Sequence, residues 1–311
     1  MLGSDCQDDL TKGCCEPSTK SSMALWAGAG LVVIAAFLFA SHDAIAKTLS
    51  KSHSPFQVAW LRFLLHAIIV GAWLYLRGHH RYLYTQKLQL HSLRALALVL
   101  VSVSMYWAVS LIPLSLATAI QFLSPIIVTL ISVVYLRERI GWRRSVAIVF
   151  GFLGVVIVIA PGVISGGVAL LIPLFTACAL AIYVLLTRQL SAPSEALPAI
   201  GLMPIICALI LSPIMPFVWQ SMAWQDLPLI LVMAVFGAMS HICLQIGLGF
   251  ASASVMAPFL YSQVVWATLL GVLFYSDPIG LSFVLGASII VGSGVAIWWF
   301  GTDVGQPETA H

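Results

Sequence analysis

Long apolar runs separated by short polar breaks occupy the chain from about residue 23 to residue 300. A membrane-spanning helix needs roughly 20 mostly apolar residues. Barrel strands would be about ten residues long with alternating polarity, and these runs are too long and too uniformly apolar for that. We therefore predict an all-α polytopic membrane protein with ten transmembrane helices at Met23–Ala46, Pro55–Leu76, Leu93–Ile112, Leu114–Leu136, Ser145–Ala160, Val168–Leu186, Leu197–Trp219, Pro228–Phe250, Ala253–Tyr275 and Leu281–Phe300.

Proline, glycine or charge marks the breaks, as at Ile112-Pro113, Pro161-Gly162 and Asp277-Pro278. No soluble domain is inserted between the runs. Residues 1–22 and 301–311 are polar, and we expect both to be cytoplasmic tails, the first of them disordered.

Composition supports the membrane assignment. Hydrophobic residues make up 61% of the 311 residues and charged residues 8%, against about 25% charged in an average soluble domain. So few charges cannot form the polar shell of a soluble enzyme or a nucleic-acid-binding domain. The high apolar fraction also excludes a disordered chain. The expected surroundings are therefore a lipid bilayer, with no nucleic-acid partner.

The placement of Lys and Arg predicts the orientation, because cytoplasmic loops carry the excess of these residues. Eleven fall on the side of the termini and two, Lys47 and Lys51, on the other. Both termini should therefore be cytoplasmic. The eleven are Lys12, Lys20, Arg77, Arg81, Lys87, Arg94, Arg137, Arg139, Arg143, Arg144 and Arg188.

The two halves of the chain align when one is shifted by 139 residues. Ser115 then meets Ser254, Thr129 meets Thr268, and Ile140-Gly141 meets Ile279-Gly280. The first five runs fall on the last five, and an odd number of crossings places the two copies in opposite orientations. We expect two inverted five-helix repeats, residues 23–160 and 161–300, an architecture typical of secondary transporters with a midplane site between the copies.

Several segments in the two halves carry recognisable motifs. They are Asp43-Ala-Ile-Ala-Lys47, Pro55 to Arg62, Ala117-Thr-Ala-Ile-Gln-Phe-Leu-Ser-Pro125, Leu136-Arg-Glu-Arg-Ile-Gly141, Gly151-Phe-Leu-Gly154, Ala257-Pro-Phe-Leu-Tyr-Ser-Gln263 and Tyr275-Ser-Asp-Pro-Ile-Gly280. With these segments the chain resembles the drug/metabolite transporter superfamily, specifically its EamA branch. The resemblance covers about residues 23–300 and implies ten helices in two inverted repeats, with transport that does not use ATP. The second half departs from the pattern in lacking a proline at Ser262-Gln263-Val264 and in having Asp277 in place of the commoner Glu.

Four ionisable residues in the first two runs are candidates for coupling or gating: Asp43, Lys47, Arg62 and His66. Charges inside a membrane are costly and face a cavity or a partner. Asp43 and Arg62 each lie roughly 10 Å below the outer surface at 1.5 Å per residue, so they could pair. That pair is either a structural pin between two helices or a switch with Asp43 as the proton carrier. His66 is either a hydrogen-bonded core residue or a proton relay.

A second set of polar and aromatic residues could converge on an amphipathic substrate cavity. Lipid-facing amides would lack hydrogen bonds, so they should point inward, and aromatic rings can stack on a solute while offering one polar atom. Each aromatic taken singly could equally be packing. The candidates are Tyr106, Trp107, Gln121, Ser124, Tyr183, His241, Gln245, Tyr261, Gln263 and Trp266.

No Walker motif, HExxH motif or Cys/His cluster is present, so we expect no ATP coupling, cofactor or metal. The favoured function is a proton-coupled secondary transporter in a bacterial inner membrane. Its partner would be one small amphipathic metabolite, most readily exported as an amino-acid-like compound, a metallophore or a toxic compound. The alternatives are uptake of a vitamin or nucleotide-like cofactor and, less favoured, a membrane-embedded enzyme acting on lipid.

Overall fold

The computed structural model describes residues 19–78, 84–136, 142, 146, 149–158, 167–190, 195–250 and 259–301, and every regular element among them is helical. The first half contains α1 (Thr19–Leu49), α2 (Pro55–Leu76), α3 (Leu88–Leu111), α4 (Leu114–Gln121), α5 (Ser124–Leu136) and a helix at Val149–Val158. The second half contains η2 (Gly167–Leu170), α7 (Leu171–Gln189), α8 (Ala196–Leu211), η4 (Ser212–Ile214), α9 (Met215–Val218), α10 (Leu227–Phe250), α12 (Ser262–Tyr275) and α13 (Leu281–Gly301).

The described helices fit a polytopic membrane protein. Six are long and apolar enough to cross a membrane: Trp26–Leu49, Pro55–Leu76, Leu88–Leu111, Gly167–Thr187, Pro198–Val218 and Leu227–Gly247. Four shorter apolar helices lie within the other predicted runs, at Leu114–Val128, Val149–Val158, Ser262–Tyr275 and Leu281–Ser293. The total of ten crossings therefore stays a prediction.

Helix boundaries differ from the hydropathy pattern at several polar ends. α1 begins at Thr19 and α3 at Leu88, several residues before the predicted runs. Polar residues can extend a helix beyond the apolar layer, and in α3 His91 and Arg94 are held there by partners on the neighbouring α8. Residues 1–18, 302–311 and the Arg-rich turn at 137–141 lie outside the described residues, as do Arg81, Arg143 and Arg144.

The fourth predicted run is two helices rather than one. α4 ends at Gln121, a turn follows at Phe122 and Leu123, and α5 begins at Ser124. Pro125 has no backbone N–H to continue the helix, which accounts for the interruption. A second turn lies at Tyr261, directly before α12. The rings of Phe122 and Tyr261 pack against each other with centroids 5.1 Å apart.

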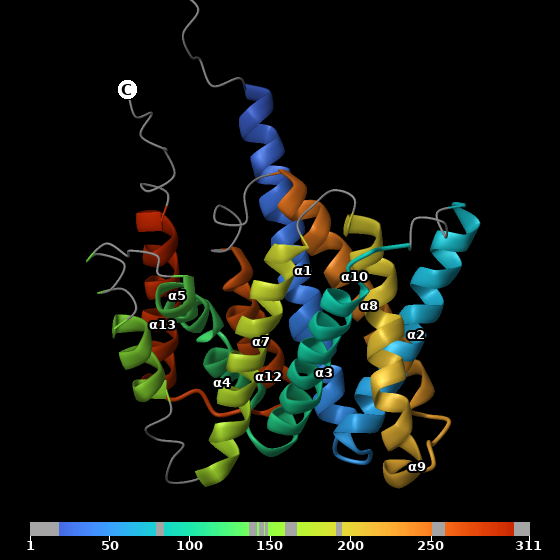
Figure 1. Cartoon of the computed structure of the whole chain (residues 1–311). Coiled ribbons are helices and arrows are strands. Elements are labelled where there is room, and N and C mark those ends of the chain that lie inside the picture. The colour runs from blue at the N-terminus through green and yellow to red at the C-terminus, as the bar shows by residue number, and fades with distance from the viewer. Residues whose placement is uncertain are drawn as a thin grey trace, which may run out of the picture.

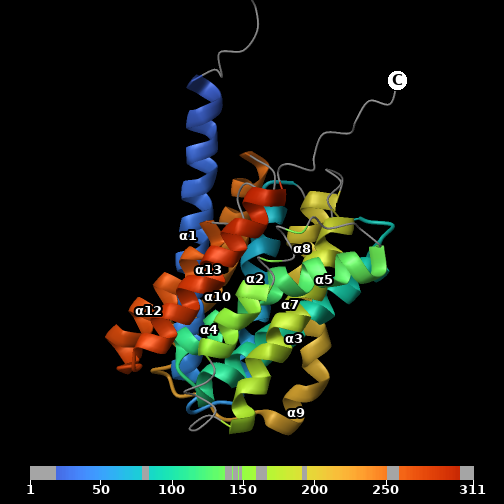
Figure 2. The same ribbon diagram turned by 90° about the vertical axis from the view of Figure 1, so that its left-hand side faces the viewer.

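Helices from the two halves of the chain are interleaved. α1 packs along α10 and α12, α3 along α7 and α8, and α2 along α8 and α10. Figures 1 and 2 show α1 passing through the body of the protein, and α1 begins at the same end of the molecule at which α13 finishes. The core therefore forms between the halves, where the midplane site expected of inverted repeats would lie.

Glycines allow the helix Val149–Val158 to approach α13 closely. A Cβ atom added at Gly286 would lie 2.6 Å from the Gly154 carbonyl oxygen and 2.4 Å from Val158 Cγ2. One added at Gly154 would lie 2.9 Å from the Gly286 carbonyl oxygen. Small residues at such crossings bring two backbones together and so maximise packing in lipid.

Gly286→Ala is expected to push these two helices apart and to lower the free energy of unfolding by about 1–3 kcal/mol. Gly292→Ala on the same helix is the matched control, because a Cβ there would meet nothing within 4 Å. Thermal unfolding of both variants in the same detergent measures the difference. Equal melting temperatures for the two variants would contradict the proposed crossing.

Candidate functional site

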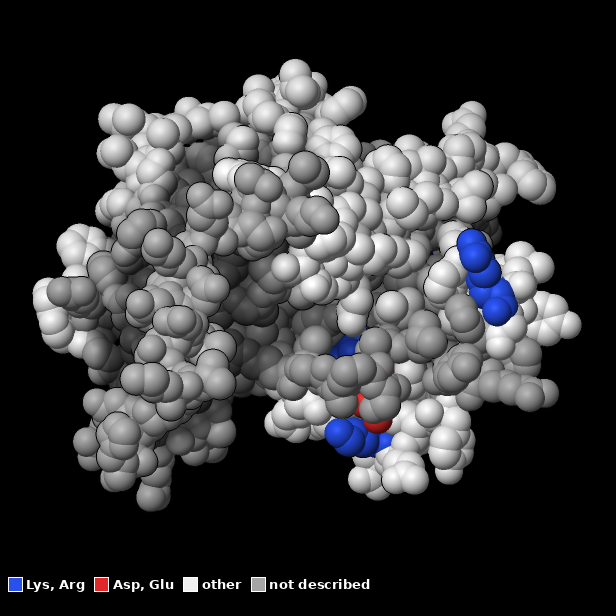
Figure 3. All heavy atoms as spheres, turned by 90° about the horizontal axis from the view of Figure 1, so that it is seen from above, with Lys and Arg blue, Asp and Glu red and all other residues white. Residues whose placement is uncertain are grey.

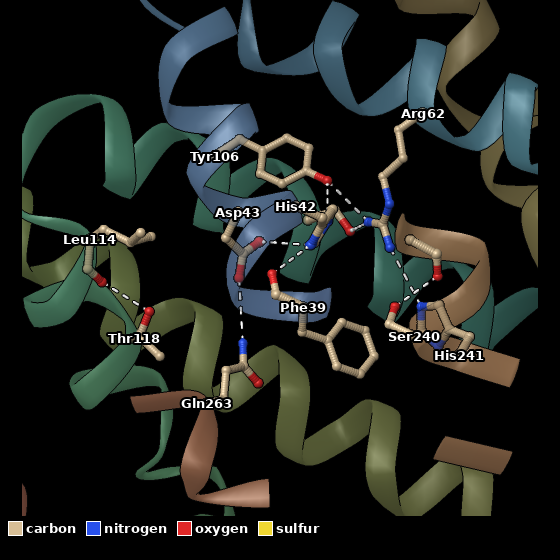
Figure 4. A network of polar contacts seen from close by, with 12 residues as sticks. Phe39, His42, Asp43, Arg62, Tyr106, Leu114, Thr118, Ser240, His241 and Gln263 are labelled. Carbon is tan, nitrogen blue, oxygen red and sulfur yellow. Dashed lines mark hydrogen bonds and ion pairs between the residues drawn. The ribbon is translucent and has the colours of Figure 1, made fainter. Parts of the chain in front are cut away.

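Buried ionisable side chains gather where α1, α2, α3 and α10 meet (Figure 4). α1 contributes His42 and Asp43, α2 contributes Arg62 and His66, and each of these four is at most 4% exposed. α10 contributes His241, whose ring stacks on His66 with centroids 6.0 Å apart. Such a concentration of costly groups in apolar helices favours a functional site over simple packing.

Arg62 is the cation of this cluster. Its Nη1 donates to Ser102 Oγ at 3.0 Å and to Tyr106 Oη at 3.1 Å, and its Nη2 lies 3.4 Å from His241 Nε2. Gly237 lets the guanidinium lie against α10, because a Cβ at that position would come within 2.9 Å of Arg62 Nε. Within the described part of the chain, no carboxylate forms an ion pair with Arg62.

His42 and Tyr106 connect Arg62 with Asp43. Arginine can only donate, so Tyr106 Oη accepts from Arg62 and its own hydrogen is free for His42 Nε2, 2.8 Å away. His42 Nδ1 then carries the ring proton, because it donates to the Phe39 carbonyl at 2.9 Å. Asp43 Oδ1 lies 3.3 Å from the same Nδ1. The result is a chain of hydrogen bonds from the guanidinium through Tyr106 to His42, and the Asp43 carboxylate lies against the His42 ring.

The predicted direct pair between Asp43 and Arg62 is therefore wrong for the described conformation. The two residues lie at similar depths in the structure, as expected, and belong to one cluster. The rotation of each helix about its axis, which an estimate of depth does not give, places His42 and Tyr106 between them. The other polar neighbour of Asp43 is Gln263, whose Nε2 lies 3.5 Å from Asp43 Oδ2.

Lys47 belongs to a separate polar cluster one turn further along α1. Its Nζ lies 3.0 Å from Asp277 Oδ1 and 3.3 Å from the Ile112 carbonyl oxygen. Asp277 Oδ2 also accepts from the backbone N–H of Leu114 at 2.7 Å. Tyr275 donates to the Ala44 carbonyl, and its ring lies beneath the Lys47 ammonium. These contacts join the first half of the chain to α12.

A small cavity lies on the side of the central cluster toward the start of α1. Both halves of the chain line it: α2 and α3 from the first, and α7, α8 and α10 from the second. Of the predicted residues, His66, Tyr183, His241 and Gln245 line this cavity, together with Arg94 and Met203. The cavity is smaller than the roomy one that the sequence pattern indicated.

The remaining predicted residues lie elsewhere. Trp107 is 49% exposed and points away from the interior, whereas Tyr106 beside it is 1% exposed and part of the central cluster. Trp266 packs edge-on against Phe37 at a centroid distance of 5.2 Å. Gln121, Ser124, Tyr261 and Gln263 are buried at the helix breaks and at the start of α12. Gln121 Oε1 and Trp266 Nε1 have no hydrogen-bond partner among the described residues.

Four important residues were missed by reasoning from sequence. His42 adjoins Asp43 in an apolar run, and that adjacency was an available signal. Arg94 was counted among the cytoplasmic loop charges, although it is only 5% exposed, and Glu195 was not singled out at all. Asp277 was noted as a turn acid without a partner. Across the described residues, no group of His, Cys, Asp and Glu side chains could hold a metal ion.

The carboxylate of Glu195 joins α8 to α3 outside the spanning segments. Its Oε2 accepts hydrogen bonds from His91 Nε2 and Thr85 Oγ1, each at 2.8 Å. The hydrogen bond from His91 is the larger cause, followed by that from Thr85, and together they hold the pKa of Glu195 below its ordinary value. The folded protein therefore binds the proton less readily than the unfolded chain does.

Acidification is expected to remove this contribution to stability. A carboxyl whose pKa is lower in the folded state stabilises the protein above its unfolded pKa of about 4.3 and loses that effect as pH falls through the folded pKa. Glu195→Gln should therefore show a shallower fall in melting temperature than the unsubstituted protein on acidification through that range. Parallel pH profiles for the two proteins would contradict the assignment.

Residues 26–160 match the model of the EamA-like transporter family. The S-adenosylmethionine uptake transporter of Rickettsia felis is 23% identical over 264 residues, covering 85% of this chain and 90% of that protein. The riboflavin transporter of Vibrio cholerae is 29% identical over 238 residues, covering 75% and 79%. The pseudopaline exporter of Pseudomonas aeruginosa is 24% identical over 273 residues, covering 86% and 94%.

A solved crystal structure is also similar in fold. Its TM-score is 0.63 at 17% sequence identity, and the match covers 89% of this chain and 99% of that one. At this identity the similarity concerns the fold alone. The names of these relatives all describe transport, and they include both an uptake transporter and an exporter.

Proposed function

Because this chain belongs to the EamA branch of the drug/metabolite transporter superfamily, we propose that it carries one small amphipathic solute across a bacterial inner membrane by proton-coupled alternating access. The family and the names of the relatives point to a transporter rather than an enzyme. The observation that carries the mechanism is the cavity beside the buried ionisable cluster, because both halves of the chain contribute its walls. A relative movement of the halves would change the shape of such a cavity.

Two inverted repeats, residues 23–160 and 161–300, are the framework of this proposal. Helix contacts that occur in matching pairs support it. Contacts of α1 with α10 correspond to those of α7 with α3, and contacts of α2 with α10 correspond to those of α8 with α3. The two helix breaks support it as well, since Phe122 and Tyr261 are 139 residues apart, the same offset that aligns the halves.

Contacts between the two halves close the protein on the side away from the termini. Lys47 pairs with Asp277, and His53 Nε2 lies 2.9 Å from Asp226 Oδ2. The amide of Gln57 donates to the Gln220 carbonyl oxygen at 2.8 Å, and its oxygen accepts from the Gln220 N–H at 2.9 Å. We assign these contacts to an outer gate that opens during the cycle.

Asp43 is the proposed proton carrier. It is a buried carboxylate in the core of the protein, and the chain of His42 and Tyr106 leads from it to Arg62 at the edge of the cavity. A solute that binds near Arg62 would alter that chain, and this provides a route from binding to protonation. His66, His241, Tyr183 and Gln245 are the proposed solute-binding residues, because they line the cavity.

The termini are proposed to be cytoplasmic. Seen from the end where α1 begins, the described charged groups are mostly Lys and Arg (Figure 3), as expected of a cytoplasmic face. The cavity would then lie on the cytoplasmic side of Arg62. Export begins with loading from that side and is the favoured direction, whereas the relative named as an S-adenosylmethionine uptake transporter favours uptake.

Cross-linking of the outer gate tests this mechanism. His53→Cys and Asp226→Cys together, in a background without native cysteines, provide two thiols for a short bismaleimide. Metabolites in cells and medium are compared with and without the protein, and then with and without cross-linker. We expect some solutes to change between the compartments with the protein and to stop changing after cross-linking. Their direction of change separates export from uptake.

The two single-cysteine variants control for labelling itself, and transport should continue in both after treatment. Transport that persists in the cross-linked double variant would overturn the gating proposal. A metabolite profile that is the same with and without the protein would overturn the transport proposal itself.

A further inference from the structure

The walls of the cavity carry positive charge and no negative charge. Arg94 lines it, and Arg62 stands behind it in contact with His241. None of the described lining residues is acidic. The nearby carboxylates have other partners, since Asp43 lies against His42 and Gln263, and Glu195 accepts from His91 and Thr85.

Arg94 is held in a fixed position without being neutralised. Its Nη2 donates to the Ala199 carbonyl oxygen at 2.8 Å and contacts Met203 Sδ at 3.2 Å. The guanidinium lies over the ring of Tyr183 at 5.6 Å from the centroid. Within the described part of the chain, Arg94 has no ion pair with an acid. A buried, preorganised and unpaired guanidinium is suited to a carboxylate or phosphate, which it can bind in a bidentate manner.

Other donors of the cavity are also available. Arg62 Nη2 can only donate, so His241 Nε2 accepts and His241 Nδ1 carries the ring hydrogen. His66 is 1% exposed, yet its Nδ1 has no hydrogen-bond partner among the described residues. Gln245 adds an exposed amide. An unpartnered buried ring nitrogen beside a cavity indicates a polar group that is supplied from outside the protein.

We infer that this cavity binds the anionic group of the transported solute, a carboxylate or phosphate, with Arg94 as its counter-ion and His66, His241 and Gln245 as further hydrogen-bonding partners. This inference rests on the proposed transport function, since it names the chemical class of the solute. The Tyr183 ring holds the guanidinium from behind and gives the site an aromatic wall, which suits a planar group next to the anion. A cationic solute would meet two arginines and no acid.

Binding to the purified protein in detergent tests the charge preference without requiring transport. The probes are benzoate, indole-3-acetate and phenyl phosphate, each beside its neutral counterpart benzamide, indole-3-acetamide or phenol. We expect at least one anion to raise the melting temperature of the protein more than its neutral counterpart does. Equal shifts within every pair, including no shift at all, would overturn the inference.

Two variants locate the binding. Gln245→Glu places a carboxylate in the cavity at an exposed position and should weaken anion binding about tenfold or more, since like charges repel at short range. Gln89→Glu is the matched control, since it adds the same charge at an exposed position of α3 away from the cavity lining. Arg94→Lys should keep the preference for anions at lower affinity, and Arg94→Gln should lose it. Equal binding by Gln245→Glu and Gln89→Glu would overturn the location.

The headgroup of an anionic lipid carries the same phosphate chemistry as an anionic solute. A competition experiment therefore distinguishes a lipid ligand from a solute ligand. Short-chain phosphatidylglycerol and phosphatidylcholine are titrated against the bound probe. No displacement by either lipid supports a solute site, whereas selective displacement by phosphatidylglycerol would overturn it in favour of a headgroup site. Anion binding without any transport would contradict only the proposed function, and transport of neutral or cationic solutes alone would contradict only this inference.

Discussion

Asp43→Asn is expected to abolish accumulation of the solute driven by a pH gradient, lowering the initial rate about tenfold or more. Asparagine is nearly isosteric with aspartate and keeps a hydrogen-bond acceptor for Gln263, but it cannot carry a proton. Buried acids that relay protons in transporters show this dependence on ionisation. The measurement uses proteoliposomes and the solute identified by the metabolite comparison.

Solute exchange without a pH gradient distinguishes coupling from folding. If Asp43 carries only the proton, Asp43→Asn vesicles should still exchange labelled for unlabelled solute. Asp43→Glu restores an ionisable group and should recover part of the gradient-driven rate. Undiminished gradient-driven accumulation by Asp43→Asn across pH 5–8 would exclude Asp43 as the proton carrier. Loss of exchange together with accumulation would instead assign it a structural role.

His42→Gln tests the path that leads from Asp43 toward Arg62. Glutamine can still accept from Tyr106 and donate to a carbonyl, but it does not relay a proton. We expect its gradient-driven rate to fall while exchange is retained, as for Asp43→Asn. An unchanged rate would leave Asp43 as the carrier and remove His42 from the path.

The largest effect on stability is expected at Asp277. Its carboxylate is buried, pairs with Lys47, and accepts from the Leu114 N–H, so Asp277→Ala leaves a buried ammonium without a counter-ion and a buried N–H without its acceptor. Removing one member of a buried ion pair costs about 3–5 kcal/mol of unfolding free energy. Asp277→Asn keeps an acceptor for Leu114 and should cost less than Asp277→Ala.

The Lys47→Met/Asp277→Leu double variant and an exposed control complete this test. Removing both charges together should restore most of the stability, because no unpaired charge is left in the apolar layer. Asp226→Asn alters the other outer contact, where the carboxylate is 27% exposed, and should cost only about 0–1 kcal/mol. A double variant that is no more stable than Asp277→Ala would contradict the pairing of Lys47 with Asp277.

Most of the helical framework was accessible from hydropathy. Six predicted runs are long apolar helices in the structure, because a chain in lipid must satisfy its backbone internally and helices do so over about 20 residues. The fourth run was predicted as a single helix, whereas the structure interrupts it directly before Ser124, where Pro125 cannot continue the helical hydrogen bonds. The break at Tyr261 was not predicted either.

Residue chemistry and burial also followed from sequence, because an ionisable group in an apolar run has to face the protein interior. Asp43, Lys47, Arg62 and His66 are all buried as expected. Their partners were not accessible in this way. Arg62 contacts Ser102, Tyr106 and His241, which lie 40, 44 and 179 residues away along the chain.

Partner choice depends on how each helix is rotated and on which helix lies beside it, and a one-dimensional pattern contains neither quantity. Trp107 and Tyr106 are adjacent and chemically alike, yet packing of α3 against its neighbours buries one ring and exposes the other. From the sequence alone, Arg94 could not be told apart from a loop charge that sets the membrane orientation. Its buried position depends on α8, which packs beside α3. Hydropathy and loop charge thus suffice for a polytopic helical protein with internal ionisable groups, whereas the cavity and the identity of the interacting pairs arise from contacts between helices distant in the chain.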